Sequence, residues 1–417
     1  MAEDDIYGSR VSYEKLVASL PTLASPILKG KQIYYCKNPK NLEHFKKLIV
    51  YFEVKDISYI RRSRVLKEMA LITYATEKDL RDCSRDDVNE IVAFMHTRYK
   101  AIESKKEFIK NIKVIWKVLF PEKDQLGRVD DTLTPYPVRH LTRKIDKSKE
   151  KLRNDRVNFA DFERIVKYFE REPKIQGYLM LALESLGRPQ EILLRKIRNF
   201  EFYDSYAKVW ITEHGKEGTG FLQSIDSYPY LQKWFQLHPL RGDQNAYFFI
   251  NEGNRKKFEP LKPNYINKRL TVACKDLGIG KKITCYSLKR NGITFRRIRG
   301  DSDVQIQHAA RWTSTRQLQV YDMSNQEDAL RMELVKRGIV QAKTMEEQQF
   351  QPKTKQCVFC NISNGFTAEF CAGCKRPLNR EKIQEIAKKH EMLMNDEMIN
   401  KVHLMEKKLN EMLKFSF

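Results

Sequence analysis

Two Cys-x-x-Cys pairs near the end of this 417-residue chain constrain its fold more than any other feature. Cys357 and Cys360 form the first pair, and Cys371 and Cys374 follow after ten intervening residues. Four thiolates at this separation suit tetrahedral zinc and leave no open coordination position for a substrate. A ribbon of this size folds only by binding its metal. We therefore predict a zinc ribbon over residues 355–378 with a structural Zn²⁺.

The charge of the chain indicates a polyanionic partner. Its net charge is +23, from 77 Lys and Arg against 54 Asp and Glu. The excess recurs along the whole chain, which favours nucleic acid over a membrane surface, because membrane binding concentrates charge on one amphipathic segment. The apolar runs are far shorter than the roughly 20 residues that span a bilayer, and the acidic start lacks a signal-peptide core. We expect a cytoplasmic, DNA-associated protein with no membrane partner.

The remaining cysteines are scattered and are expected to be buried thiols in a reduced cytosol. They are Cys36, Cys83, Cys274 and Cys285.

The length of the chain predicts two or three domains. Residues 1–35 show no sustained periodicity and are interpreted as an N-terminal arm. Residues 36–120 carry apolar side chains three and four positions apart, which predicts a helical DNA-binding module. Within it, Ser84 followed by Asp86 and Asp87 is typical of a helix start. Prolines, glycine and a dense charge run predict a basic linker over residues 121–155.

Residues 156–345 are again mainly helical, and a cluster of β-branched and aromatic residues around a Gly-rich turn predicts a small antiparallel sheet within them. The tail, residues 379–417, is predicted to be one long helix. Its apolar seam either packs back on its own chain or pairs with another subunit. That seam consists of Met398, Val402, Met405, Leu409 and Met412. The predicted fold class is mainly α and multidomain.

Tyr321 ends a polar stretch, and alone it would be interpreted as a packed or hydrogen-bonded phenol. A tyrosine can attack a phosphate only where cations neutralise the oxygens and a group protonates the leaving oxygen. Arg188 stands at a predicted helix break with Glu191 one turn on, which alone favours a surface ion pair. Lys216 lies in the turn of the predicted hairpin, where a lysine is usually solvated.

The order and spacing of these residues are more specific than each one alone. Arg188 and Lys216 are separated by 27 residues, a basic helix "ITCYSLKRNGITFRRIRG" follows, and Trp312 stands nine positions before Tyr321. This series resembles the tyrosine recombinase (phage-type integrase) family over about residues 150–342. The helical module before it is similar, more loosely, to the family's core-binding domain. The zinc ribbon is similar to that of archaeal members, which implies an integrase of an archaeon or of its virus or plasmid.

The resemblance implies a role for each matching residue. Arg188 corresponds to the first catalytic arginine, and Glu191 to the acidic residue that supports it. Lys216 corresponds to the proton donor to the leaving 5′ oxygen. Trp312 takes the position where the family has His or, less often, Trp, and Tyr321 takes the place of the nucleophile.

The second box departs from the family pattern His-x-x-Arg. Tyr286 stands in the place of the histidine and Lys289 in that of the arginine. The 23-residue interval from Lys289 to Trp312 favours Lys289 as the second cation. The planar guanidinium of Arg290 is better suited to clamping two phosphate oxygens, so both residues remain candidates.

The implied function is site-specific DNA recombination, which would integrate or excise a mobile element. Tyr321 would attack the scissile phosphate with no metal or other cofactor in catalysis and form a 3′-phosphotyrosyl intermediate, which rejoins without ATP. The resemblance implies a homo-tetramer on double-stranded DNA attachment sites. Two alternatives stay open, a catalytically inactive DNA-binding relative and a strand-nicking enzyme akin to type IB topoisomerases. The altered second box favours the inactive relative.

Overall fold

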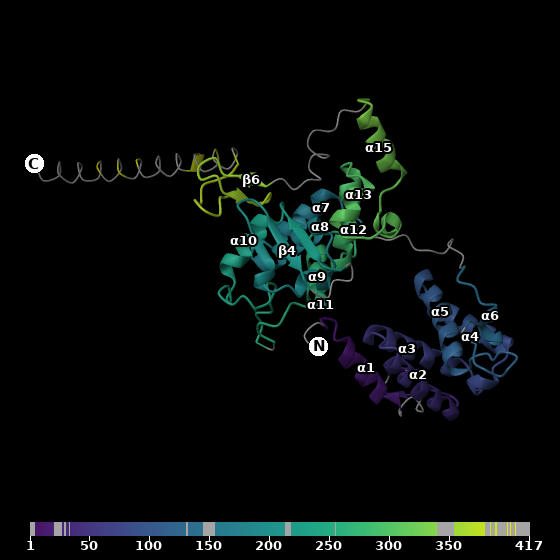
Figure 1. Ribbon diagram of the computed structural model, residues 1–417. Coiled ribbons are helices and arrows are strands. Elements are labelled where there is room, and N and C mark those ends of the chain that lie inside the picture. The colour runs from purple at the N-terminus through teal and green to yellow at the C-terminus, as the bar shows by residue number, and fades with distance from the viewer. Residues whose placement is uncertain are drawn as a thin grey trace, which may run out of the picture. The chain divides into compact units, whose positions relative to one another are not determined.

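The computed structural model describes residues 5–20, 27–28, 31–32, 34–130, 132–144, 155–212, 218–254, 256–339 and 354–379, together with single helical positions between 384 and 405. The chain divides into two compact units, Met1–Arg153 and Asn154–Phe417 (Figure 1). Among the described residues, no helix combines the length and the apolar character that crossing a bilayer requires.

The first unit is a helical module built around α3, which contacts α1, α2, α4 and α5. Its core holds large apolar side chains such as Phe45, Leu66 and Trp116, each at most 1% exposed. The helices are α1 (Ser9–Ala18), α2 (Leu42–Val54), α3 (Tyr59–Ala75), α4 (Arg85–Arg98), α5 (Ile102–Leu119) and α6 (Tyr136–Arg139), with 3₁₀ turns η2 (Pro39–Asn41) and η3 (Leu80–Asp82) and a short β1–β2 pair (Ile27–Leu28, Lys31–Gln32).

The start of α4 confirms the predicted helix cap. The Ser84 hydroxyl accepts a hydrogen bond from the backbone of Asp87 at 3.3 Å, and the Ser84 backbone donates to the Asp87 carboxylate at 2.8 Å. Hydrogen bonds from Lys78 and Ser84 lower the pKa of Asp87 to about 2. The carboxylate therefore stays ionised at the positive end of the helix dipole, where a negative charge is stabilising.

The stretch predicted to be a linker begins as a packed segment. Helix α6 contacts α4 and α5, and Val138 within it is fully buried. Lys113 donates a hydrogen bond to the Arg139 carbonyl at 3.2 Å. The module therefore continues to about residue 141, because these contacts bind the segment to its helices.

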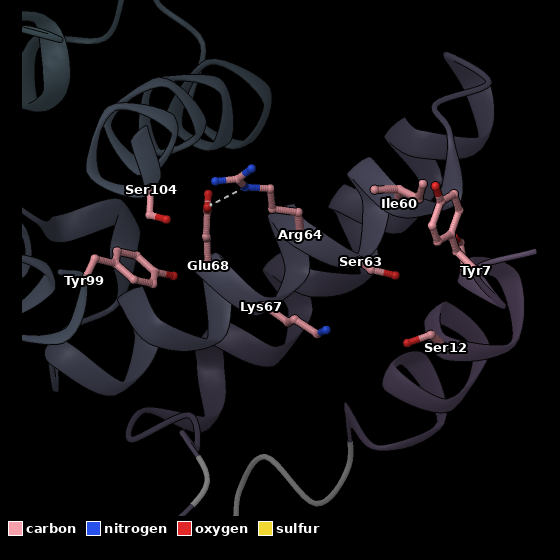
Figure 2. Close-up of a pocket in the computed structure, with 10 residues that line it drawn as sticks. Tyr7, Ser12, Ile60, Ser63, Arg64, Lys67, Glu68, Tyr99 and Ser104 are labelled. Carbon is pink, nitrogen blue, oxygen red and sulfur yellow. Dashed lines mark hydrogen bonds and ion pairs between the residues drawn. The ribbon is translucent and has the colours of Figure 1, made fainter. Parts of the chain in front are cut away.

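A pocket of about 450 Å³ lies in the first unit between α1, α3 and the segment joining α4 to α5 (Figure 2). Tyr7 and Lys67 line it, and Arg64 pairs there with Glu68, one turn further along α3. Burial raises the pKa of Glu68, while hydrogen bonds from Asn111 (2.6 Å) and Arg64 (3.2 Å) hold its two carboxylate oxygens. The buried carboxylate of this pocket is thus bonded within the module.

Before the cysteine ribbon, the described part of the second unit is helical with one small sheet, as predicted. The sheet is antiparallel in the order β3 (Phe200–Phe202), β4 (Ala207–Ile211) and β5 (Gly220–Ser224), with Val209 opposite Phe200 and Leu222. The helices are α7 (Phe159–Tyr168), α8 (Pro173–Ser185), α9 (Pro189–Leu193), α10 (Tyr228–Leu237), α11 (Pro263–Asp276), α12 (Cys285–Ile298), α13 (Asp303–Ala309), α14 (Leu318–Tyr321) and α15 (Gln326–Lys336), with 3₁₀ turns η4 (Ile197–Asn199) and η5 (Thr315–Gln317).

Helix α8 is the centre of this unit and contacts α7, α9, α10, α12 and β5. Its approach to α12 depends on Gly292, because a Cβ there would collide with the Leu183 carbonyl oxygen. This close approach fixes the position of the α12 residues beside Gly292, which include Lys289 and Arg290.

The cysteine ribbon contains β6 (Lys355–Gln356) paired with β7 (Ser363–Asn364) and packs on α7 and α10 (Figure 1). Phe366 contacts Phe159 with ring centroids 5.6 Å apart, and the Tyr230 and Thr367 hydroxyls are 2.8 Å apart. Gly365 is required at this contact, since a Cβ there would lie 2.5 Å from the Tyr230 ring. The ribbon is therefore docked on the helical body.

The described positions of the predicted tail helix are helical, and they are residues 384, 388, 389, 398, 401 and 405. Met398 and Met405 are exposed, so these two seam positions do not pack against the described part of the chain. Val402, Leu409 and Met412 lie outside the described residues.

The four scattered cysteines are all buried, which confirms the prediction, and burial raises the pKa of each thiol. They are Cys36, Cys83, Cys274 and Cys285.

Candidate active site and metal centre

Arg188 and Glu191 form a buried pair at the start of α9. Helix α8 ends on Leu186 in a left-handed conformation (φ 56°), and Pro189 then begins α9. The Arg188 backbone N–H donates to Glu191 Oε2 at 2.8 Å, and Arg188 Nη1 lies 3.6 Å from Glu191 Oε1. Their side chains are 7% and 1% exposed, so the simpler interpretation as a surface ion pair is wrong.

Arg311 joins this pair, although sequence reasoning did not single it out. Its Nη2 lies 2.9 Å from Glu191 Oε1, and its Nη1 donates to the Gly218 carbonyl at 3.2 Å. Two guanidinium groups therefore contact one buried carboxylate. The only signal in the sequence was the position of Arg311 directly before Trp312, which gives no indication of where its side chain points.

A second group surrounds Tyr321. Lys289 is fully buried, and its ammonium nitrogen lies 5.4 Å from the Trp312 ring centroid and 5.5 Å from that of Tyr321. The Trp312 and Tyr321 rings are themselves 5.4 Å apart at an angle of 32°. These distances fit cation–π contacts between the lysine and both rings. Leu186 packs in the same apolar cluster, which brings this group close to Arg188 along the chain.

Arg290, the alternative to Lys289, points to a different partner. Its guanidinium forms an ion pair with Asp155, whose carboxylate also accepts a hydrogen bond from Ser287 at 3.0 Å. Asn291 donates to the Asp155 carbonyl at 2.8 Å. Adjacent residues of a helix point about 100° apart, since one turn takes 3.6 residues. Lys289 therefore faces Tyr321 while Arg290 ties α12 to the chain around Asp155.

The other two predicted residues are placed less fully. Tyr286 lies in the first turn of α12 and is 41% exposed. Lys216 belongs to residues 213–217 of the β4–β5 turn, which lie outside the described residues. The described end of that turn, at Gly218, is the part that Arg311 contacts.

An open cleft of about 590 Å³ borders Arg311. It is lined by β5 residues, including Phe221. Three arginines and a histidine between the last turn of α12 and Trp312 also line it. These are Arg296, Arg299, Arg311 and His308. Asp301 also lines the cleft and pairs with Arg296 and Arg299. The cleft is consequently basic next to the buried arginine–carboxylate group, a charge pattern suited to a polyanion.

The clustered cysteines have the geometry of a metal centre. All four Sγ atoms of Cys357, Cys360, Cys371 and Cys374 lie within 4.8 Å of one another. Tetrahedral zinc, with Zn–S distances of about 2.3 Å, needs sulfurs about 3.8 Å apart. Burial opposes ionisation of Cys371, but hydrogen bonds from the backbones of Cys374 and Gly373 and from Cys360 lower its pKa to about 6. The residues therefore fit a bound metal ion.

Comparisons with solved structures find recombinases and integrases. XerH site-specific recombinase bound to a palindromic difH substrate, a post-cleavage complex, aligns with a TM-score of 0.54 at 13% identity, over 78% of this chain and 95% of that chain. The Tn1549 transposon integrase in complex with transposon right end DNA gives 0.53 at 11% identity, over 71% and 99%. A lambda integrase dimer bound to a COC′ core site gives 0.50 at 15% identity, over 66% and 94%.

No protein-family model matches the sequence, and no curated protein matches it. At such low identities the structural likeness establishes the fold. The chain has a tyrosine recombinase fold with a C-terminal cysteine cluster able to hold a metal ion.

Proposed function

We propose that this protein is a tyrosine recombinase that cleaves and rejoins DNA at specific sites, integrating or excising a mobile element. The observation that carries the proposal is the burial of Lys289 against the rings of Trp312 and Tyr321, in the same unit as the buried Arg188–Glu191 pair. Buried cations beside a phenol supply the charge neutralisation that attack on a phosphodiester requires.

In the proposed reaction the Tyr321 oxygen attacks the scissile phosphorus, and its proton passes to water, either directly or relayed through the Tyr286 hydroxyl. The P–O5′ bond breaks, Lys216 protonates the departing 5′ oxygen, and the 3′ phosphate stays esterified to the tyrosine. Arg188 and Lys289 neutralise the non-bridging oxygens, with Glu191 orienting Arg188. Attack by a 5′ hydroxyl on the phosphotyrosine reverses these steps and rejoins a strand without ATP.

Trp312 has a role consistent with its contacts. It packs on Tyr321, and its indole Nε1 is buried without a hydrogen-bond acceptor among the residues that the structure describes. A phosphate oxygen would satisfy this donor. We assign Trp312 to holding the phenol and donating to the phosphate.

Assembly on DNA is proposed to be tetrameric, on two duplexes. Helix α15 (Figure 1) follows Tyr321 and has no buried residue. Arg156 tethers it through two 2.7 Å hydrogen bonds to Asp328. It is the element that we assign to contacting a neighbouring subunit. We further propose that the cysteine ribbon binds structural zinc. We also propose that the mobile element belongs to an archaeon, because the ribbon is similar to that of archaeal integrases.

The test uses a suicide DNA substrate nicked near an attachment site, from which the cleaved end diffuses away. Wild-type protein is expected to form a denaturation-resistant covalent adduct, Tyr321→Phe none, and Tyr286→Phe an adduct at a reduced rate or unchanged. Absence of an adduct from wild-type protein on DNA that it binds would favour the inactive DNA-binding relative.

A further inference from the structure

We infer that Arg311 is a further phosphate-binding residue, whose guanidinium contacts a non-bridging oxygen of the scissile phosphate. The inference rests on the proposed strand-cleavage function. It assigns to Arg311 a guanidinium contact with the phosphate. Lys289 has no guanidinium, and that of Arg290 is paired with Asp155.

The side chain of Arg311 is held by two contacts, but not all of its N–H donors have an acceptor among the described residues. It is 10% exposed, with one nitrogen 2.9 Å from Glu191 and another donating to Gly218. Its Nε is buried and has no hydrogen-bond acceptor among the described residues, and the same holds for Nε1 of the adjacent Trp312. A buried donor without an acceptor is destabilising, because it has lost its hydrogen bonds to water without replacing them. Two such donors on neighbouring residues mark a place for an oxygen-bearing ligand.

The backbone conformation of Arg311 and the neighbouring Gly220 together position the Arg311 side chain. Arg311 has φ 57°, a left-handed conformation that is unfavourable for a residue with a Cβ. Gly220, with φ 144°, lies against the arginine stem, since an ideal Cβ at that position would be 3.4 Å from Arg311 Cδ. Unfavourable backbone conformations persist only where the surrounding structure holds them, and they are frequent at functional sites. Here the conformation allows Arg311 to reach the carboxylate that Arg188 also contacts.

The chemistry of the neighbouring cations explains why a second guanidinium is needed. Lys289 offers a point charge beside Tyr321, whereas binding two phosphate oxygens in fixed geometry requires a planar fork. Arg290 has that fork but is paired with Asp155. Arg311 brings a guanidinium to the Glu191 group from outside α12, next to Trp312 and at the edge of the basic cleft.

A purely positioning role for Arg311 would also affect activity, because the residue connects Glu191 to the β4–β5 turn. The two roles differ in their dependence on the charge of the phosphate. A residue that neutralises a non-bridging oxygen becomes dispensable when that oxygen is replaced by a methyl group. A residue that only holds the turn is needed equally with either substrate.

The experiment therefore uses the full chain and two suicide substrates, one with the natural scissile phosphate and one with a methylphosphonate there. Arg311→Gly is the test variant, because glycine accepts the left-handed backbone. Arg316→Ala is the matched control, as Arg316 is exposed and lies five positions away. Circular dichroism and DNA-binding measurements establish that both variants are folded and bind DNA.

We expect Arg311→Gly to cleave the phosphate substrate about 100-fold more slowly than wild type. On the methylphosphonate it should match wild type, and Arg316→Ala should match wild type on both. Equal slowing of Arg311→Gly on the two substrates, or no slowing on the phosphate, would overturn the inference while leaving the proposed function intact. Failure of wild-type protein to cleave the phosphate substrate would overturn the proposed function and this inference with it.

Discussion

Two arginine–carboxylate groups in the second unit use the same residue types in different proportions. Asp155 pairs with one guanidinium, that of Arg290, and is further bonded by Ser287. Glu191 contacts two guanidiniums, those of Arg188 and Arg311. One carboxylate balances one cation in the first group, as in a structural ion pair. In the second group two guanidinium groups share one carboxylate, and this is the group that we propose to bind the phosphate.

Removing an arginine from each group should distinguish the proposed catalytic group from the structural ion pair most clearly. We expect Arg188→Ala to slow covalent adduct formation by about 100- to 1,000-fold, because it removes a cation from the proposed transition state. Adduct formation on the suicide substrate under single-turnover conditions measures this rate. A loss below about threefold would contradict the assignment of the Glu191 group to phosphate binding.

Arg290→Ala is the counterpart in the other group. Breaking a buried ion pair leaves Asp155 charged and without its cation, so the free energy of unfolding should fall by about 3 kcal/mol. Urea unfolding measures the loss, and the adduct rate of the folded variant should change little. A variant that keeps its stability but loses adduct formation would move Arg290 into the catalytic group.

Metal removal should separate the ribbon from both arginine groups. We expect a chelator to lower the melting temperature by unfolding the ribbon, since thiolate ligands hold it together only around a metal. Gly365→Ala should weaken its docking on Tyr230 while leaving the four cysteines able to bind zinc. Zinc content, measured by atomic absorption, should be one ion per chain before chelation in wild type and in this variant alike. A chain purified without zinc, with an unchanged melting profile after chelation, would contradict the metal assignment.

A third carboxylate, Asp226, extends the comparison to a group in which burial outweighs the nearby charges of Arg299 and Arg296. Burial, together with the nearby charge of Glu184, raises the pKa of Asp226 to about 7. Its folded pKa thus lies above the unfolded value, so the folded state holds a proton that the unfolded state releases between about pH 4 and 7. Stability from this group is present below pH 4 and lost as pH rises through 7. The melting temperature should fall across this window, and the fall should be smaller in Asp226→Asn. An identical pH dependence in both proteins would contradict this assignment.

Much of the fold could be predicted from sequence because its signals are local. The Ser84 cap, the 3.6-residue periodicity of the first module and the glycine-rich turn between β4 and β5 each act within a few residues. The burial of the scattered cysteines and the clustering of the other four could likewise be predicted from the sequence. The packed start of the linker was missed, because nothing local indicates that Val138 would be covered.

The candidate site could be predicted less fully, because its geometry depends on contacts distant in sequence. Whether Lys289 or Arg290 faces Tyr321 depends on how α12 is rotated against α8, which the close approach at Gly292 fixes. The burial of Arg188 could not be read from a short Gly-Arg-Pro stretch. Arg311 was missed because a left-handed arginine is uncommon and its partner, Glu191, is 120 positions earlier.

The most direct test of the account is to identify the residue that carries DNA after cleavage. Wild-type adduct from the suicide substrate would be digested with protease and nuclease, and the modified peptide sequenced by mass spectrometry. The account predicts a nucleotide attached to the tyrosine oxygen of Tyr321. Attachment at Tyr286 or at any other residue would contradict it.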